Sequence, residues 1–185
     1  MQGFRVAIRY AKSLLGLSSE LGKLEVVKAD MEMIGETLQE NRDLQLLLKS
    51  PLVKADKKFA VFTALFDGKV DELTMSFITI LNKKGRENIL GAVCVKFAEL
   101  YKVEKDIVTA FVKSAQPLTD EARALLNARV KEAFGGEVEL VEEVDESLIG
   151  GYVLRVGDQQ YNQSVSHQLY KMKREFDSNP FIKEF

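Results

Sequence analysis

The sequence has 185 residues, 46% of them hydrophobic, and a formal net charge of −2. That length allows one large domain or two small ones with real cores. No apolar run approaches the roughly 20 residues that a membrane-spanning helix needs, and a single cysteine, Cys94, excludes an internal disulfide and suits a reducing compartment. We therefore expect a soluble globular protein that meets a membrane only indirectly, through partners.

The two halves of the chain differ in charge. Residues 1–105 hold 17 lysines and arginines against 14 acids, whereas residues 106–185 hold 9 against 14. The acids concentrate in residues 137–146, which either attract a basic partner or form a solvated strand face and loop. Neither half has the clustered basic face that nucleic-acid binding requires, so we expect no nucleic-acid partner. The basic first 19 residues are interpreted as an amphipathic helix rather than a mitochondrial transit peptide.

Residues 3–104 have helical periodicity throughout. Apolar residues recur at steps of three and four in six segments that are separated by breaks, namely 16–19, 41, 50–51, 67–68 and 83–85. We expect Ser18, Asn41 and Asp71 to begin helices, and Gly85 to end the fifth as a left-handed cap after two lysines. The pattern predicts a six-helix bundle over residues 1–105.

The period changes at Lys105. Residues 107–113 alternate as a strand with β-branched residues on both faces. Thr119 is expected to cap a helix that ends at Gly135-Gly136, and residues 138–144 suggest a second strand.

A β-hairpin follows. Strands over residues 152–156 and 159–161 flank a two-residue Gly157-Asp158 turn. The preceding Gly150-Gly151 pair permits a close backbone approach or a bulge, and Asn162 is expected to cap the last helix. Residues 106–185 thus predict a small β-α-β-β-β-α domain, which gives the fold class α + (α+β).

The sequence contains little that points to chemistry. His167, the only histidine, could be combined with Asp145 and with Ser147 or Ser164 into a triad, but neither serine lies in a nucleophile elbow. One cysteine and one histidine cannot supply the usual metal ligands, and the paired glycines are followed by neither a Lys-Ser/Thr nor a helix, as a phosphate loop requires. We expect no enzyme activity, no metal and no cofactor.

Four separated motifs carry a resemblance to a known family. They are Arg9-Tyr-Ala-Lys-Ser-Leu-Leu15, Leu81-Asn-Lys-Lys-Gly-Arg86, Ser114-Ala-Gln-Pro-Leu118, and Asp145-x-Ser-Leu-Ile-Gly-Gly151 with Val156-Gly-Asp158. With these motifs in this order, the sequence resembles the delta subunit of bacterial F-type ATP synthases, whose mitochondrial relative is the oligomycin-sensitivity-conferring protein, over essentially all 185 residues. The family usually has Asp-Gly-Ser-Val at the start of the last helix with an arginine close behind, and this sequence departs from it with Asn162-Gln-Ser-Val165 followed by Ser166 and His167.

The resemblance implies a non-catalytic stator connector, present once per complex on the cytoplasmic face of the bacterial inner membrane. Such proteins tie the catalytic head to the peripheral stalk, so that the head cannot rotate with the central shaft while protons drive that shaft. The helical domain would receive the N-terminal helix of an alpha subunit in a groove between the first and fifth helices. The matching positions, unless they are simply core, are Tyr10, Ser13, Leu14, Phe77 and Ile80.

The resemblance also assigns the second domain a partner. It would hold the C-terminal ends of the stalk's b subunits, and we expect Leu169, Met172 and Phe176 of the last helix to make that contact with help from the acidic strand.

Two other classes stay open at this point. An RNA-associated helical factor predicts a basic, aromatic surface, which the near-neutral first half does not match. A generic scaffold for helical peptides fits the composition, and only the order of the motifs speaks against it.

Overall fold

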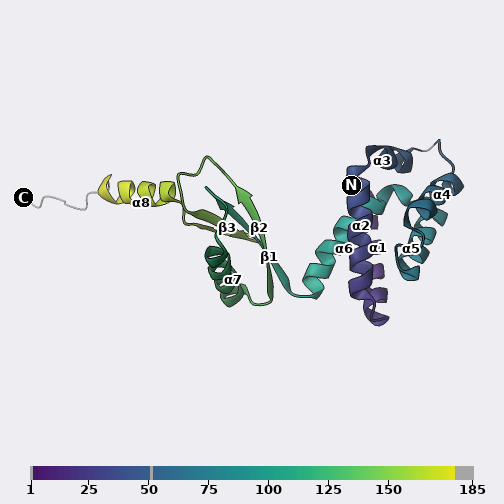
Figure 1. Cartoon of the computed structure of the whole chain (residues 1–185), viewed down its shortest axis with the longest axis horizontal. Coiled ribbons are helices and arrows are strands. Elements are labelled where there is room, and N and C mark those ends of the chain that lie inside the picture. Colours follow the sequence, from purple (N-terminus) through teal and green to yellow (C-terminus); the bar gives the residue numbers. More distant parts are fainter. Residues whose placement is uncertain (1, 51, 178–185) are drawn as a thin grey trace, which may run out of the picture. The chain divides into compact units, whose positions relative to one another are not determined.

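The computed structural model describes residues 2–50 and 52–177. The chain divides into two compact units, Met1–Glu104 and Lys105–Phe185. The first unit is helical, and the second holds a four-stranded mixed sheet with two helices (Figure 1). The broad prediction of a helical part followed by a small sheet with helices is confirmed. Within the described residues, no helix is both long enough and apolar enough to span a membrane.

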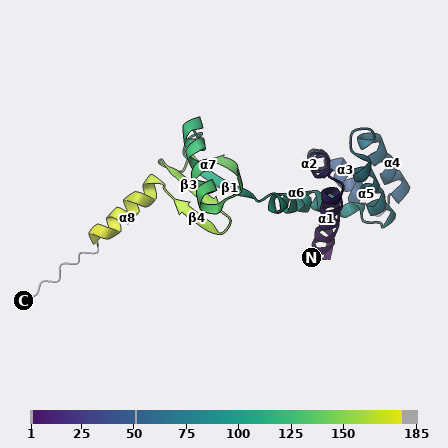
Figure 2. The same cartoon turned by 90° about the horizontal axis from the view of Figure 1, so that it is seen from below.

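The helical unit buries the apolar positions that recur at steps of three and four. Its largest fully buried side chains include Phe62, Phe66 and Phe97. Helix α1 lies along α6, and α6 also packs on α2 (Figure 1, Figure 2). The elements are α1 (Gln2–Glu20), α2 (Leu24–Glu40), α3 (Arg42–Lys49), α4 (Ala55–Phe66), α5 (Glu72–Lys83), the short 3₁₀ helix η1 (Glu87–Ile89) and α6 (Leu90–Glu104).

Both ends of α5 are as predicted. The Asp71 carboxylate accepts a hydrogen bond from the Leu73 N–H at 2.9 Å, so Asp71 is the N-cap. At the other end, Gly85 has a φ of +62°. The N–H groups of Gly85 and Arg86 donate to the carbonyls of Asn82 and Leu81, each at 2.9 Å, which is a Schellman motif. This turn fixes the direction in which the chain leaves α5.

The first helix ends later than the sequence predicts. Gly16 stays inside α1, and no atom would lie within 4 Å of a Cβ added there. The helix ends instead at Glu20, and Gly22, with a φ of +65°, closes it. Ser18 does not begin α2, because it is buried within α1 and its hydroxyl donates to the Leu15 carbonyl at 2.9 Å. The helix continues past Gly16 because one exposed glycine weakens a helix without breaking it.

Two asparagines expected as N-caps serve other groups. The Asn41 amide donates back to the Thr37 carbonyl at 3.1 Å and makes no cap bond to α3. Asn162 ends strand β4 (Gln159–Asn162), and its Oδ1 accepts from the Ser164 N–H at 3.0 Å. The cap of α8 (Val165–Asp177) is Ser164, whose hydroxyl accepts from the His167 N–H at 3.3 Å. Both predictions were wrong. The Asn41 side chain bonds to a carbonyl at the end of α2, and the Asn162 side chain forms a local Asx turn, so neither caps the helix that follows it.

The sheet has the strand order β2-β1-β3-β4, in which β1 and β2 are parallel and the other pairs are antiparallel. Helix α7 (Asp120–Phe134) connects the parallel pair and covers one face of the sheet (Figure 1). The other strands are β1 (Ile107–Ser114), β2 (Glu137–Val144) and β3 (Tyr152–Val156). The core between sheet and helix consists of Ala110, Val112, Leu126, Val130, Leu154 and Val156.

The paired glycines before β3 bring the start of α8 to one end of the sheet. Gly151 has a φ of +78°, and a Cβ added to it would lie 2.3 Å from the Gln163 carbonyl oxygen. The Val165 N–H donates to the Gly150 carbonyl at 3.0 Å, and the Gln163 N–H donates to the Tyr152 carbonyl at 2.9 Å. The predicted close backbone approach is confirmed, and it anchors the first turn of α8.

We predict that Gly151→Ala destabilises the sheet unit far more than Gly157→Ala. Both glycines have positive φ, but no atom would lie within 4 Å of a Cβ at Gly157. Gly157→Ala should cost about 1 kcal/mol in the free energy of unfolding, and Gly151→Ala about 3 kcal/mol, because the methyl group also meets backbone. Urea denaturation of the two variants measures the difference, and equal losses would contradict the close approach.

We also predict that Cys94 resists thiol reagents in the folded protein. Burial within α6 raises the pKa of its thiol to about 12, so almost no thiolate exists at pH 8. Reaction with dithionitrobenzoate should therefore be slow in buffer and rapid in denaturant. Fast labelling of the native protein would show that the α6 core opens readily.

Candidate partner-binding surfaces

Helices α1 and α5 meet through an aromatic pair. The rings of Tyr10 and Phe77 lie edge to face, with centroids 6.2 Å apart and planes at 72°. Ser13 and Leu17 share the Tyr10 side of α1 by helical spacing, and Leu73 and Ile80 share the Phe77 side of α5. We call these six residues the α1–α5 face.

The structure separates the five predicted head-binding residues into two groups. Leu14 and Phe77 are 2% and 8% exposed, so they belong to the core. Tyr10 is half-buried, Ser13 is exposed with its hydroxyl donating to the Arg9 carbonyl, and Ile80 is 50% exposed. Of the five, the residues available to a partner are therefore Ser13, Ile80 and part of the Tyr10 ring.

Arg86 borders the α1–α5 face and is a contact residue that the sequence reasoning missed. Its Nη1 donates to the Tyr10 hydroxyl at 3.0 Å, and its guanidinium carbon lies 5.7 Å from the Tyr10 ring centroid, within cation–π range. The Schellman turn at Gly85 directs Arg86 back toward α1. The first two sequence motifs thus meet in space, and only the turn geometry reveals that contact.

A polar network fixes the start of α5. The buried Asp30 carboxylate of α2 accepts from the Thr74 hydroxyl at 2.7 Å and from the Asp71 N–H at 2.9 Å. Lys23 pairs with Asp71 at 2.9 Å, and the hydrogen bonds from Lys23 and from the Leu73 N–H lower the pKa of the Asp71 carboxyl below its ordinary value. This network holds α5 against α2.

A buried ion pair lies just beyond the other end of α5. Lys58 of α4 pairs with Glu87 of η1 at 2.7 Å and also donates to the Leu48 carbonyl at 2.9 Å. Buried polar contacts therefore lie at both ends of α5: the hydrogen bonds of Asp30 at its start and the Lys58–Glu87 pair just beyond its end.

Helix α8 presents a second candidate surface. Leu169, Met172 and Phe176, the three residues predicted to bind the stalk, recur at steps of three and four and are all exposed, Phe176 to 81%. They lie on one stripe with Val165. A 13-residue helix with no burial of its apolar stripe is only marginally stable in water. An exposed apolar stripe of this kind is typical of a surface that binds a partner.

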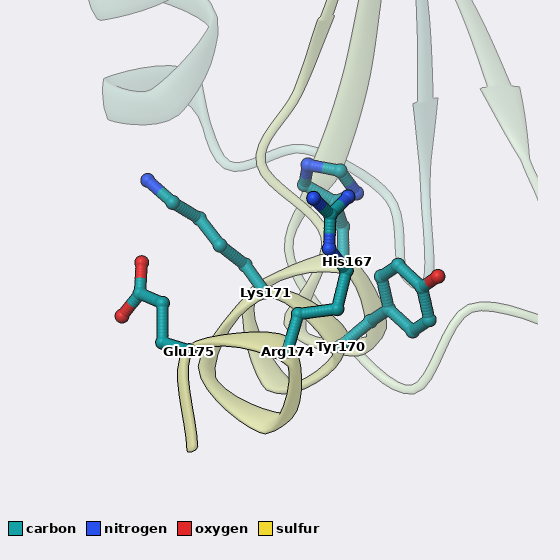
Figure 3. Close-up of a pocket in the computed structure, with 5 residues that line it drawn as sticks. All are labelled: His167, Tyr170, Lys171, Arg174 and Glu175. Carbon is teal, nitrogen blue, oxygen red and sulfur yellow. The ribbon is translucent and has the colours of Figure 1, made fainter. Parts of the chain in front are cut away.

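The polar side of α8 carries no catalytic arrangement. His167, Tyr170, Lys171, Arg174 and Glu175 line an open hollow of about 400 Å³ (Figure 3), and the histidine is exposed. Asp145, which the sequence offered as a member of a triad, accepts hydrogen bonds from the N–H and the hydroxyl of Ser147 instead. The bond from the serine hydroxyl holds the pKa of the Asp145 carboxyl below its usual range. No cluster of metal-ligating side chains occurs within residues 2–50 and 52–177.

The acidic stretch is divided between the two faces of the sheet. Glu142 lies on the α7 side and pairs with Arg123, which lowers the pKa of the Glu142 carboxyl. Glu139 and Glu143 lie on the open face with the half-exposed Phe111, and Glu143 pairs with Lys113 at 2.9 Å. Two of the glutamates in this stretch, Glu142 and Glu143, are thus paired with cations of the same domain.

Comparisons with known proteins cover nearly the whole chain. Residues 6–176 match the model of the family described as ATP synthase delta (OSCP) subunit. The chain is 41% identical to the ATP synthase subunit delta of Cytophaga hutchinsonii over 176 residues, which cover 95% of this chain and 96% of the relative. It is 39% identical to the protein of the same name from Christiangramia forsetii, with 98% of each chain covered.

The comparison with solved structures also leads to an ATP synthase. A chain of the Toxoplasma gondii mitochondrial ATP synthase hexamer matches with a TM-score of 0.67 and 25% identity, over 94% of this chain and 98% of that chain. The exposed helical surfaces are then those of an assembly component rather than of an enzyme. The chain belongs to the ATP synthase delta (OSCP) subunit family, and it is a structural, non-catalytic part of the stator of the F-type ATP synthase.

Proposed function

We propose that this protein joins the catalytic head to the peripheral stalk by gripping a different helix with each of its two units. The α1–α5 face takes the N-terminal helix of an alpha subunit, and α8 takes the C-terminal end of the stalk's b subunits. The observation that carries this proposal is that Leu169, Met172 and Phe176 of the apolar stripe are each more than half exposed, on a helix too short to be stable alone.

Rigid support favours the α1–α5 face as the head contact. Tyr10 is held by Phe77 on one side and by Arg86 on another, so a partner meets a surface that is already ordered. Ile80 stands beside it and is half exposed, as an anchor for an apolar side chain of a partner helix should be. Preorganisation of this kind lowers the entropy cost of binding.

Mechanical demand favours α8 as the stalk contact. A stator must stay bound through each torque step, which requires several buried anchors on one interface. Leu169, Met172 and Phe176 would supply three, each worth about 2 kcal/mol or more once buried. Backbone hydrogen bonds to Gly150 and Tyr152 tie the start of this helix to the sheet, so a load on α8 passes into the domain.

In this role one copy serves each complex, at the cytoplasmic face of the bacterial inner membrane, and reaches the membrane only through the rest of the synthase. A generic scaffold for helical peptides would show the same exposed stripes, but its two units would not each bind a different, specific partner. The two experiments below therefore test each end separately.

Ile80→Asp should weaken binding of an alpha-subunit N-terminal peptide at least tenfold, because a carboxylate would be buried against apolar surface. Val26 and Val95 are also 50% exposed, but they lie on α2 and α6. Val26→Asp and Val95→Asp are therefore matched controls that should bind normally. Calorimetry of the three variants decides the placement, and an unchanged affinity for Ile80→Asp would remove it.

Leu169→Asp and Phe176→Asp should each release the stalk while leaving the thermal midpoint of the free chain unchanged, because both side chains are exposed. Tyr170→Asp is the control, since Tyr170 is also exposed but faces away from the stripe. Co-purification with a fragment that holds the C-terminal end of a b subunit is the readout. Full retention by both stripe variants would show that the stalk binds elsewhere.

A further inference from the structure

The contacts of α1 and α5 fix their relative direction. Tyr10, in the first half of α1, touches Phe77 and also Arg86, which follows the end of α5. Lys23, just after α1, pairs with Asp71, which caps the start of α5. The two helices therefore run antiparallel, and the start of one lies beside the end of the other.

This antiparallel arrangement places basic residues at one end of the α1–α5 face and acidic residues at the other. One end collects cations from the start of α1 and the end of α5, and the first 19 residues hold no acid at all. Glu87, next to Arg86 in the sequence, does not offset them because it is buried against Lys58. The cations of this basic end are Arg9, Lys83, Lys84 and Arg86, all exposed except the half-buried Arg86, whereas Arg5 and Lys12 lie on the other side of α1 by helical spacing.

The opposite end is acidic. Glu20 near the end of α1 and Glu72 at the start of α5 are both exposed. Asp71 is there too, with Lys23 as its partner. Eleven residues of helix separate Glu72 from Lys83, or about 16 Å. That distance exceeds the Debye length of about 10 Å at 0.1 M salt, so each end acts on a partner independently.

We propose that the α1–α5 face selects a helix by its charge order. The partner helix carries carboxylates beside its apolar stripe at the end that lies over Arg9, Lys84 and Arg86, and cations at the end that lies over Glu20 and Glu72. This rests on the proposed function of the face as a helix-binding surface, and it adds the chemistry and the direction of the bound helix.

Apolar and charged groups of this face would contribute differently to binding. Ile80 and the Tyr10 ring supply the contact that excludes water. Exposed ion pairs contribute little affinity in water, but opposed like charges penalise the wrong orientation. Direction is therefore set by charge, while binding itself is set by the apolar stripe.

Two synthetic peptides test this directly. Both have the same leucine stripe and are held helical by a staple. One has two glutamates in its first turn and two lysines in its last, and the other has the reverse. Each carries a fluorine tag at its acidic end. The full chain, with Cys94→Ala, receives a spin label at Lys83→Cys or at Glu72→Cys, substitutions that each remove one charge at one end of α5.

In both peptides the tag should relax several-fold faster with the label at position 83 than at position 72, because direction follows charge. If the same terminus lies near position 83 in both peptides, or if neither label is preferred, the charge order is wrong. If binding of both peptides is also unaffected by Ile80→Asp, the face itself is wrong, and the proposed head contact fails with it.

Charge reversal gives an independent readout. Lys84→Glu should weaken a peptide with an acidic end about fivefold at low salt, and the difference should vanish near 0.5 M salt. Lys57→Glu, an exposed lysine on α4, is the matched control and should bind like the wild type. An equal loss in both variants would reflect net charge alone and would overturn the proposal.

Discussion

The edge-to-face contact between Tyr10 and Phe77, with Arg86 on a second side of Tyr10, joins α1 to α5, and the hydrogen bonds of the buried Asp30 hold the start of α5. The apolar surface and the charge order of the α1–α5 face depend on this arrangement. The Arg86 contact in turn depends on the Schellman turn at Gly85, which a residue with a β-carbon would strain, because φ there is +62°. A backbone requirement in one loop thus positions a side chain on another helix.

The second unit relies on backbone in a similar way. The close approach of Gly151 to the Gln163 carbonyl allows the first turn of α8 to bond to the sheet, while the rest of that helix carries its apolar stripe into solvent. A domain that only had to fold would bury such a stripe. Leaving it open costs stability, and we propose that binding of the stalk is the reason for that cost.

Much of this could be predicted from the sequence, for identifiable reasons. Six helical segments follow from apolar steps of three and four, and the apolar stripe of α8, though not its exposure, follows from the same spacing at Leu169, Met172 and Phe176. The sequence could not separate Leu14 from Ile80, because both are apolar and only packing shows that one is buried and the other half exposed. Nor could it show that Ser18 and Asn41 bond backward to carbonyls of α1 and α2, since that choice depends on where each helix ends. The role of Arg86 required the three-dimensional course of the turn.

The central claim is that one molecule must hold both partners at once, and reconstitution tests it most directly. Membranes stripped of this subunit would receive Ile80→Asp, Leu169→Asp or an equal mixture of the two, and proton-driven ATP synthesis would be measured beside ATP hydrolysis by the head. The account predicts that neither variant restores synthesis, that the mixture fails as well because each molecule has only one working end, and that hydrolysis persists throughout. Synthesis restored by the mixture, or by either variant alone, would contradict it.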